Sequence, residues 1–370
     1  MHILALFFAV DGSHSKKRIL AFNKNVEKLT IVSYYRNNNV KYDNHHNLGQ
    51  SPQKHYLRRF IKIIFDVPRL RNILSINPDV QVVYAWNFDI ALLFRLVRMF
   101  SKRNYTFIYE VADIKQILLS ESLVGKVLRK LEQVILSKTD FLCVTSQAFI
   151  NNYFNKYYHF TGRTHILENK VFPPINNINS QNVIISKDRK KWRIGFIGLI
   201  RCTRSLQLLH DLANTLSDKI EIVLAGRPEE FAKDSYAILS GLKNVKNFGT
   251  YKYPDDLPKV YAQIDIIWSA DFSDPSINSK WLLPNRIYEA GIFSVPQLCF
   301  PENEATCKYI NSLNIGWMLD DSNLESVLIF FNTLTNEHYQ KVVSNYNNLP
   351  SNQFSGDDQI KSLINKVKTN

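Results

Sequence analysis

The sequence predicts an α/β protein of two domains, each built on a parallel sheet. Short apolar segments alternate with longer mixed segments throughout the 370 residues, the pattern of strands connected by helices. Near the middle, residues 171–190 begin with a Pro- and Asn-rich stretch of linker composition. A chain of this length can form two domains that each bury a core of their own.

The expected elements follow the apolar pattern in chain order. In the first half, apolar runs predict strands and 3.6-residue periodicity predicts helices; the strands are 3–10, 29–34, 80–84, 107–110 and 141–145, and the helices are 56–74, 89–101 and 122–136. In the second half, the same criteria give strands 192–197, 220–225, 245–248, 264–269, 297–300 and 316–318, and helices 205–215, 257–262 and 285–290.

Composition narrows the class of protein. A hydrophobic content of 45% is typical of globular chains. The four cysteines form no CxxC pair and have no histidine at metal-binding spacing, which favours buried thiols in a reduced, cytoplasmic compartment. The apolar run 1–10 lacks a basic leader region and is better explained as a first strand than as a signal peptide. We expect no integral membrane protein.

The net charge of +13 is distributed unevenly. Residues 1–170 hold 25 Lys or Arg against 12 Asp or Glu, whereas residues 171–370 hold 21 of each. This asymmetry indicates an anionic partner for the first half, such as acidic lipid, a lipid diphosphate or nucleic acid. Stretches 56–65 and 123–131 are basic and amphipathic, which suits docking on a membrane surface. The alternatives are a solvated basic surface and helices that simply pack on the sheet.

The segment 281–296 is the most informative motif. Pro284 and Asn285 have the residue types of a helix start, and Asn can cap it. A helix that begins after a strand presents free backbone N–H groups and a positive dipole end, which suits a phosphate group. Glu289 lies one turn into this helix, where it can reach a ribose hydroxyl. The alternative is an ordinary buried helix.

A second anion-binding pattern follows the first strand of the second half. Gly195 and Gly198 allow a ligand to approach the backbone closely, and Arg201 and Arg204 add two permanent charges. A guanidinium can bind a diphosphate through parallel N–H donors. The alternative is a pair of solvated loop arginines.

The stretch "LPNRIYEAGIFSVP" resembles the C-terminal-domain signature of GT-B glycosyltransferases, especially the family 4-like enzymes. In that family a Pro-x-x-x-Glu-Ala helix holds the nucleotide-sugar donor. The resemblance implies that Glu289 contacts the ribose and that Asn285 and Arg286 lie at the diphosphate. The family's sugar-contacting glutamate, eight positions earlier, corresponds here to Trp281.

Four further segments resemble the family in the same order. Segment 193–209 is similar to the family's Gly-Arg-Leu turn, which is followed by a lysine at the start of a helix; Arg204 corresponds to that lysine. Leu199 stands where the family has its arginine, and Arg201, two residues later, would replace it. Segment 222–227 resembles its Ala-Gly strand end, and 256–265 its Ala-x-x-Asp strand entry. Segment 244–251 resembles the nucleotide-base turn, which implies base contacts at Thr250 and Tyr251.

The resemblance implies the GT-B architecture, two Rossmann-like doubly wound domains that face a central cleft. The domains would be an acceptor-binding domain 1–170, a linker 171–190 and a donor-binding domain 191–350, with a C-terminal helix in 351–370 that crosses back to the first domain. The polar groups nearest the donor sugar would be Asp271, Asn278 and Ser279. Asp271 and Asp274 do not form a DxD motif, so we expect no metal and no cofactor besides the nucleotide-sugar co-substrate.

The acceptor side is predicted from the ends of strands in the first half. Asp113 and Glu110 follow or end a strand where a general base for a sugar hydroxyl is needed. The alternative for Asp113 is an N-cap of a helix over 114–120. Asp11, Gly12 and His14 form the other loop expected on the acceptor side.

These observations predict a metal-independent, hexosyltransferase-type enzyme in surface polysaccharide biosynthesis. It would move a sugar from a nucleotide-sugar donor, UDP-sugar favoured, to a lipid-linked or saccharide acceptor, as a peripheral protein on the inner face of the cytoplasmic membrane. A catalytically silent GT-B-like binding protein is the alternative, suggested by Trp281. Nucleic acid is not expected as a partner, because no helix-turn-helix, RNA-recognition or zinc pattern accompanies the charge.

Overall fold

The chain divides into two compact units. Unit 2 is continuous in sequence, whereas unit 1 is built from two separate segments. The computed structural model describes residues 1–36, 40–50, 56–175, 191–272 and 278–369. Unit 1 comprises Met1–Glu168 together with Asp357–Asn370, and unit 2 comprises Asn169–Gly356. Each unit is described by itself below.

Unit 1 alternates strands and helices. Its elements are β1 (His2–Phe7), α1 (Ser13–Asn25), β2 (Lys28–Tyr35), β3 (His45–Gln50), α2 (Tyr56–Ile76), β4 (Val82–Trp86), α3 (Phe88–Met99), β5 (Thr106–Val111), α4 (Gln116–Leu119), α5 (Leu123–Leu136), β6 (Phe141–Val144), α6 (Gln147–Phe149), the π-helical turn η1 (Ile150–Phe154), α7 (Asn155–Tyr158), β7 (Arg163–Ile166) and α16 (Asp357–Lys368). The described strands form one parallel sheet in the order β3-β2-β1-β4-β5-β6-β7.

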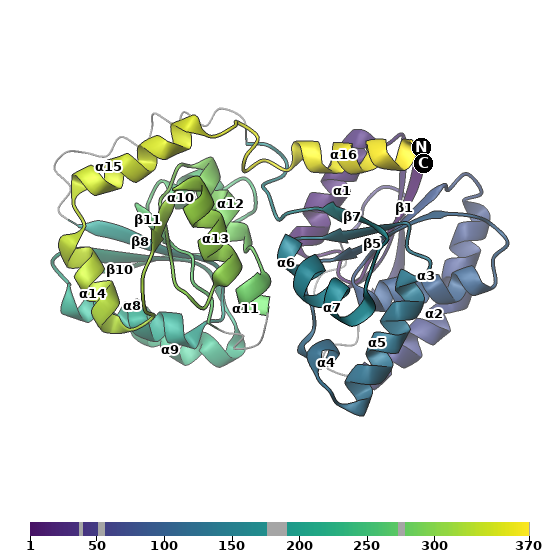
Figure 1. Cartoon of the computed structure of the whole chain (residues 1–370), viewed down its shortest axis with the longest axis horizontal. Helices are drawn as coiled ribbons and strands as arrows, with labels where there is room; N and C mark the ends of the chain where they lie inside the picture. The colour runs from purple at the N-terminus through teal and green to yellow at the C-terminus, as the bar shows by residue number, and fades with distance from the viewer. Residues whose placement is uncertain (37–39, 51–55, 176–190, 273–277, 370) are drawn as a thin grey trace. The chain divides into compact units, whose positions relative to one another are not determined.

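The strand order of unit 1 determines which helices cover each face. From β1 the chain moves outward to β2, whereas the connections β3–β4, β4–β5 and β5–β6 run in the opposite direction along the sheet. Because parallel crossovers are right-handed, α1 covers one face, and α2, α3 and α5 cover the other. Helix α16 packs beside α1 (Figure 1). Unit 1 is therefore a doubly wound, three-layer α/β structure.

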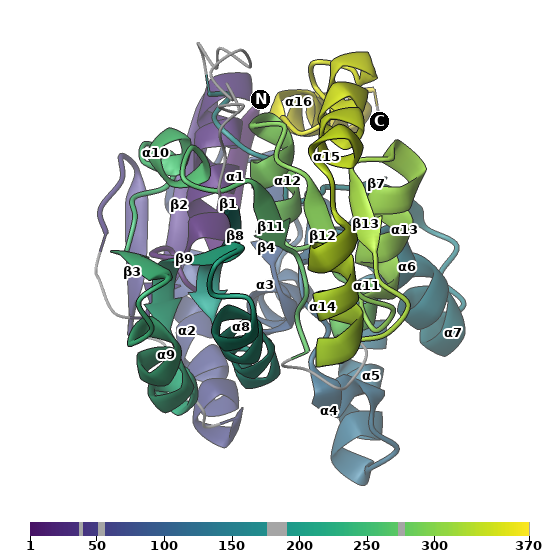
Figure 2. The same cartoon turned by 90° about the vertical axis from the view of Figure 1, so that its left-hand side faces the viewer.

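Unit 2 repeats this architecture. Its elements are β8 (Trp192–Ile200), α8 (Thr203–Thr215), β9 (Ile220–Pro228), η3 (Glu230–Ala232), α9 (Lys233–Ser240), β10 (Val245–Gly249), α10 (Leu257–Tyr261), β11 (Ile266–Trp268), α11 (Asn278–Trp281), α12 (Asn285–Ile292), β12 (Gln297–Cys299), α13 (Glu304–Leu313), β13 (Gly316–Met318), α14 (Leu324–Thr333), α15 (Asn336–Asn345) and η4 (Tyr346–Asn348). The sheet is parallel in the order β10-β9-β8-β11-β12-β13, and Figure 2 shows this unit facing the viewer.

Alternate residues of the central strands enter two separate cores in unit 2. Ile222 and Leu224 of β9 pack into a core shared with α8 and α9, whereas Val223 and Ala225 of the same strand pack into a core shared with α10 and α12. Side chains of a strand point alternately to the two faces of its sheet, so both faces of β9 are covered. This explains why the strands of this chain are continuous apolar runs.

The expected α/β fold with parallel sheets is confirmed. Several elements were not expected from the sequence, among them α1, β3 and β7. His45 and His46 lie in β3, where His45 Nε2 lies 2.8 Å from Ser33 Oγ. Of the expected linker, 176–190 lies outside the described residues, whereas Val171 and Phe172 are buried in unit 2.

Two further observations concern the whole described chain. Within the described ranges, no helix combines the length and apolar character needed to cross a membrane. The four cysteines are buried and unbridged; they are Cys143, Cys202, Cys299 and Cys307.

The closest backbone approach in unit 2 lies where β8 and β9 end, and it gives a test of the fold. Gly226 has φ +133°, and a Cβ added there would lie 1.8 Å from the carbonyl oxygen of Gly198. We expect Gly226→Ala to destabilise the protein by about 3 kcal/mol or more, measured by urea unfolding. Gly249, at φ +76°, has open space at its Cβ position. Gly249→Ala is the matched control and should cost only about 1 kcal/mol. Equal losses would contradict the close approach.

Candidate active site

The predicted donor residues of unit 2 gather at the carboxyl edge of its sheet. Because the strands are parallel, every loop that follows a strand lies at this edge. Gly198 lies near the end of β8 itself. The other predicted residues lie on the segments after β8, β10 and β11 or in α8 and α12, and they are Arg201, Arg204, Thr250, Tyr251, Asp271, Asn285, Arg286 and Glu289. The structure thus places them along one edge.

Arg204 is held at this edge by groups from two other strand ends. Its Nη2 donates to the backbone oxygen of Ser322 at 3.0 Å and also to Ser322 Oγ. Its Nη1 donates to Glu302 Oε1 at 3.3 Å. The guanidinium lies 4.5 Å from the ring centre of Phe272 and is about half exposed. The charge is therefore oriented but remains accessible to a ligand.

Arg201 pairs with Asp271, which was predicted to contact the donor sugar. Arg201 Nη2 donates to Asp271 Oδ2 at 2.8 Å and Nε donates to the same atom at 3.3 Å. Asn303 fixes the backbone of Asp271, accepting from its N–H at 3.2 Å and donating to its carbonyl at 2.8 Å. The pair joins the loop after β8 to the loop after β11.

Helix α12 begins at Asn285, the start of the expected helix 285–290, but its cap is not the expected one. Pro284 occupies the N-cap position, with φ −70° and ψ 154°, and Asn285 is the first helical residue, so Asn285 does not cap the helix. Arg286 Nη1 donates to the carbonyl of Trp268 at 3.3 Å, and its guanidinium lies 5.1 Å from the ring centre of Phe196. The first turn of α12 thus adds a cation to the positive end of the helix dipole.

Glu289 is buried inside α12 and has a tyrosine partner. Tyr261 Oη donates to Glu289 Oε2 at 3.1 Å. Tyr251 packs against the core that contains Tyr261 and Ala290 of α12. Burial, and then the charge of Glu289, raise the pKa of Tyr251. Thr250 is exposed after Gly249. The three residues predicted to contact the nucleoside therefore share the end of the edge near β10.

The residues predicted around the donor sugar are described only in part. The side chains of Asn278 and Ser279 lie outside the described part of the chain. Trp281 ends α11, is partly buried, and belongs to a helix that packs against α13.

A buried carboxylate is the centre of the polar cluster in unit 1. Glu110, near the end of β5, is fully buried. It accepts bonds from Arg18 Nε at 3.0 Å, Arg18 Nη2 at 2.9 Å and Tyr84 Oη at 2.6 Å. His14 Nε2 lies 2.8 Å from Glu110 Oε1. The cluster combines side chains of β4, β5 and α1. Arg18 also donates to the carbonyl of Leu167, which follows β7.

The protonation states follow from these contacts. Burial alone would raise the pKa of Glu110, but the Arg18 charge and then His14 outweigh it and hold that pKa well below its usual range. Burial lowers the pKa of His14, and Glu110 offsets this only in part. At neutral pH, Glu110 is therefore ionised and His14 is neutral.

The strand next to Glu110 ends in an unusual backbone conformation. His14 stacks on Trp86, the last residue of β4, with ring centres 4.8 Å apart and planes at 15°. Asn87 follows with φ +74° and ψ 160°, a region that residues other than glycine rarely adopt. The Trp86 Nε1 and Asn87 Oδ1 atoms are buried and have no hydrogen-bond partner among the described residues. Such strain and unsatisfied polarity concentrate at functional sites.

The remaining acceptor-side predictions lie on loops at this same edge. Asp113 is exposed between β5 and α4, and the N-cap of α4 is Lys115, so the alternative interpretation of Asp113 as a helix cap is wrong. Asp11 Oδ1 accepts from the backbone N–H of Arg36 at 3.0 Å. Gly12 is the N-cap of α1, which begins just before His14.

Sequence reasoning missed the partners that orient these groups. In unit 1 they are Arg18, Tyr84, Trp86 and Asn87, and in unit 2 they are Tyr261, Glu302, Asn303 and Ser322. The one local sequence signal for such a cluster was the run Trp-Asn-Phe-Asp at residues 86–89, where β4 ends and α3 begins. Within the described ranges, no three His, Cys, Asp or Glu side chains come together as a metal-binding group.

Comparison with known proteins gives one relative in sequence and many in structure. No protein-family model matches the chain. The chain is 30% identical over 267 residues to the succinoglycan biosynthesis protein ExoL of Rhizobium meliloti. That match spans 71% of this chain and 66%, just under two thirds, of the relative.

The similar solved structures cover the whole chain. A glycosyltransferase from Rickettsia africae has a TM-score of 0.67 at 15% identity, covering 100% of this chain and 98% of its own. Anabaena HepE in complex with UDP has a TM-score of 0.68 at 13% identity and full coverage of both chains. A UDP-GlcNAc 2-epimerase from Neisseria meningitidis, bound to UDP-GlcNAc, has a TM-score of 0.61 at 14% identity and full coverage.

These matches, with the two doubly wound units, establish that the chain has the GT-B fold. The resemblance to GT-B glycosyltransferases of the polysaccharide-biosynthesis type, first indicated by the motif around Glu289, is confirmed. In sequence, the chain is similar to a protein of succinoglycan biosynthesis.

The Glu110–Arg18 pair gives a prediction for stability. Glu110→Gln leaves a buried guanidinium without its countercharge, so we expect a loss of about 3–5 kcal/mol at pH 7. Because the folded-state pKa of Glu110 is lowered, its stabilising effect is complete above about pH 4.3, the usual value for glutamate. Below that pH it falls by about 1.4 kcal/mol per pH unit.

Urea unfolding of the wild type and the variant between pH 3 and 7 measures this effect. The difference in unfolding free energy should shrink as the pH falls below 4.3. The double variant Glu110→Gln, Arg18→Met is the control and should recover part of the loss at pH 7. A difference that does not change with pH would contradict the ionised state of Glu110.

Proposed function

We propose that the protein is a glycosyltransferase that moves a sugar from a nucleotide-sugar donor to a saccharide or lipid-linked acceptor in surface polysaccharide biosynthesis. The observation that carries the proposal is the carboxyl edge of unit 2, which carries Arg201, Arg204, the start of α12 and the buried Glu289. Support also comes from the relative in succinoglycan biosynthesis and from the similar fold of a glycosyltransferase.

The donor would bind along the carboxyl edge of unit 2. Glu289 would accept hydrogen bonds from ribose hydroxyls, and Thr250 and Tyr251 would contact the base. Arg201, Arg204 and the N-terminus of α12, with Asn285 and Arg286, would bind the diphosphate near Gly198. UDP is the favoured nucleotide because HepE, a structural neighbour, binds it.

The arginines would stabilise the charge that develops when the donor breaks. As the acceptor oxygen bonds to the anomeric carbon, the bond from that carbon to the diphosphate breaks and the nucleoside diphosphate leaves with the electron pair. Guanidinium groups fixed before the reaction, as Arg201 and Arg204 are by Asp271, Glu302 and Ser322, can stabilise this leaving group. Transfer would therefore not require a metal ion.

The proton of the acceptor hydroxyl needs a base, and unit 1 offers two. Glu110 is buried, ionised and surrounded by donors, so it is suited to orienting His14 rather than to accepting a proton. His14 Nε2 lies 2.8 Å from Glu110 Oε1, and in our proposal it carries the hydrogen, which leaves the lone pair on Nδ1 of neutral His14. We assign the base to His14 and retain Asp113 as the alternative.

A second candidate function follows from the epimerase match. A UDP-GlcNAc 2-epimerase shares the fold over the whole chain, so the fold alone does not decide the reaction. Transfer of label from a UDP-sugar to an acceptor supports a transferase, whereas isomerisation of the sugar while it stays on UDP supports an epimerase. Donor binding without either reaction would support the silent binding protein. The setting on a cytoplasmic membrane face is part of our proposal.

The donor site is tested by nucleotide binding. Glu289→Gln and Arg204→Ala should weaken UDP binding roughly tenfold to hundredfold, because each loses a hydrogen bond to a charged group. Thermal shift with UDP, and with GDP and dTDP for comparison, measures this effect; UDP at about 100 times its Kd should stabilise the wild type by about 2.7 kcal/mol. Glu221→Gln, at the amino end of β9, is the matched control. Unchanged binding by both variants would refute the donor assignment.

The base is tested by turnover. His14→Gln should reduce transfer by about 10²–10⁴-fold while UDP binding is retained. Asp113→Asn, on the exposed loop of the same unit, is measured in parallel. Loss of turnover in Asp113→Asn with full activity in His14→Gln would transfer the role of base to Asp113.

A further inference from the structure

Exposed apolar side chains in unit 1 gather on one of its helical layers. All large hydrophobic residues found exposed in the described part of unit 1 belong to α2, to α5, or to the end of α3. On α2 and α5 they include Phe65, which is 75% exposed, and Leu123, which is 82% exposed. The set is Phe60, Ile61, Ile64, Phe65, Ile76, Met99, Phe100, Leu123, Val124, Val127 and Val134. We call this the α2–α3–α5 surface.

Hydrogen bonds connect the three helices into one structural layer. Helix α3 packs against both α2 and α5. Arg95 Nε donates to the Val134 carbonyl at 3.1 Å, and Arg98 Nη1 donates to the Lys138 carbonyl at 2.9 Å. On the other side, Arg103 Nη1 donates to a carbonyl of α2 at 3.2 Å. The exposed side chains therefore stand on a fixed support.

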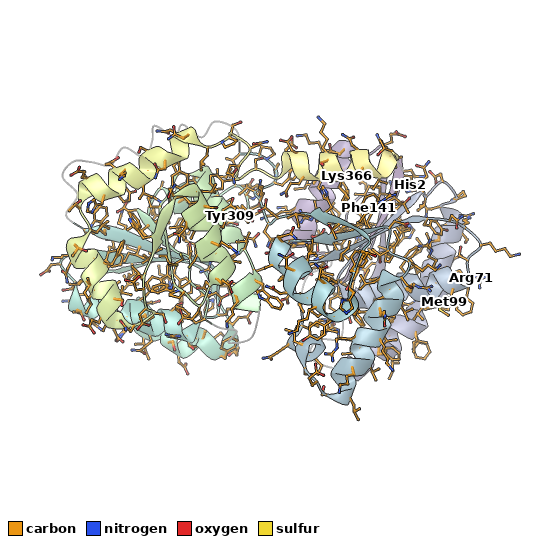
Figure 3. All side chains as sticks on the ribbon, in the orientation of Figure 1. His2, Arg71, Met99, Phe141, Tyr309 and Lys366 are labelled. Atoms are coloured by element: carbon orange, nitrogen blue, oxygen red, sulfur yellow. The ribbon has the colours of Figure 1, made fainter. Side chains whose placement is uncertain are left out.

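The same surface is basic. Residues 56–138 contain 14 Lys or Arg and 7 Asp or Glu. Two of the acidic residues, Asp66 and Asp89, are buried and pair with cations of this stretch, which are Arg59, Lys62, Arg69 and Lys115. On α5, Lys126 and Lys130 are exposed among the exposed apolar residues. Figure 3 shows Arg71 of α2 and Met99 of α3 on this helical layer.

We propose that the α2–α3–α5 surface docks on an anionic lipid bilayer and inserts its apolar side chains into the interface. This inference rests on the proposed function in one respect, because a lipid-linked acceptor would lie in that bilayer. Lysines next to exposed aliphatic residues suit lipid, since their stems cover apolar surface while the ammonium groups reach acidic headgroups. The buried centres of protein interfaces are instead depleted in lysine.

Insertion of apolar side chains should change how membrane binding depends on salt. Attraction between exposed charges is screened beyond about 8 Å at physiological salt, so purely electrostatic binding disappears as salt rises. Apolar side chains in the interface contribute a part that salt does not screen. Binding should therefore have a salt-sensitive part from the lysines and a salt-resistant part from Leu123, Val124 and Val127.

The first test places an environment-sensitive dye on α5. All four native cysteines are buried, so Leu123→Cys can be labelled selectively with a fluorescent thiol probe. Vesicles of phosphatidylcholine with phosphatidylglycerol should shift the probe emission to the blue. Ile238→Cys on α9 of unit 2, 62% exposed, is the matched control and should show no shift. No shift at position 123 would overturn the proposal.

The second test separates insertion from charge by vesicle flotation at low and high salt. The variant Leu123→Ser, Val124→Ser, Val127→Ser should lose the salt-resistant part and at least about tenfold in affinity. Lys126→Gln, Lys130→Gln should lose the preference for anionic vesicles but keep the salt-resistant part. Unchanged flotation of the serine variant, or a dimer of the wild type that this variant abolishes, would overturn the proposal.

UDP binding by each variant is measured in the same samples. Flotation without UDP binding would refute the proposed function and leave the docking surface intact. UDP binding without flotation would refute the docking surface alone.

Discussion

Parallel pairing is the constraint on which the structure depends. Two parallel strands can be joined only by a crossover, so every strand in each unit ends at the same edge and every following loop begins there. The direction of winding reverses between β1 and β4 in unit 1, and between β8 and β11 in unit 2. After the two strands of each pair, the chain turns to opposite faces of the sheet. The residues at these turns, or in the first turn of the helix that follows, include His14, Asn87, Arg201 and Asp271.

The two edges use charge in opposite ways. In unit 1 a single buried carboxylate, Glu110, is neutralised by Arg18 and lies 2.8 Å from His14 Nε2. In unit 2 the cations Arg201 and Arg204 are about half exposed, and their acidic partners orient them. The first arrangement surrounds a buried negative charge with donors, whereas the second keeps positive charge accessible at the surface.

Local patterns predicted most of the fold and the donor edge, and distant pairings were missed. The continuous apolar strands and the helix with Glu289 are encoded within a few residues, so they could be inferred from the sequence. Arg18 and Glu110 are 92 positions apart, and only the sheet brings them together. Asn87 was missed because its signal is a backbone conformation that asparagine rarely adopts. Strand β3 was missed because this edge strand follows an Asn-rich segment.

Helix α16 makes unit 1 discontinuous in sequence. Its buried Ile360, Leu363 and Ile364 belong to unit 1, and Asp357 pairs with Lys24 of α1. During synthesis these residues leave the ribosome only after all of unit 2 has been made. Unit 2 is therefore the first part of the chain that can fold to completion. Until α16 has been made, the side of α1 that packs against it stays exposed to solvent. A chain stalled before residue 357 would contain a finished unit 2 and an unfinished unit 1.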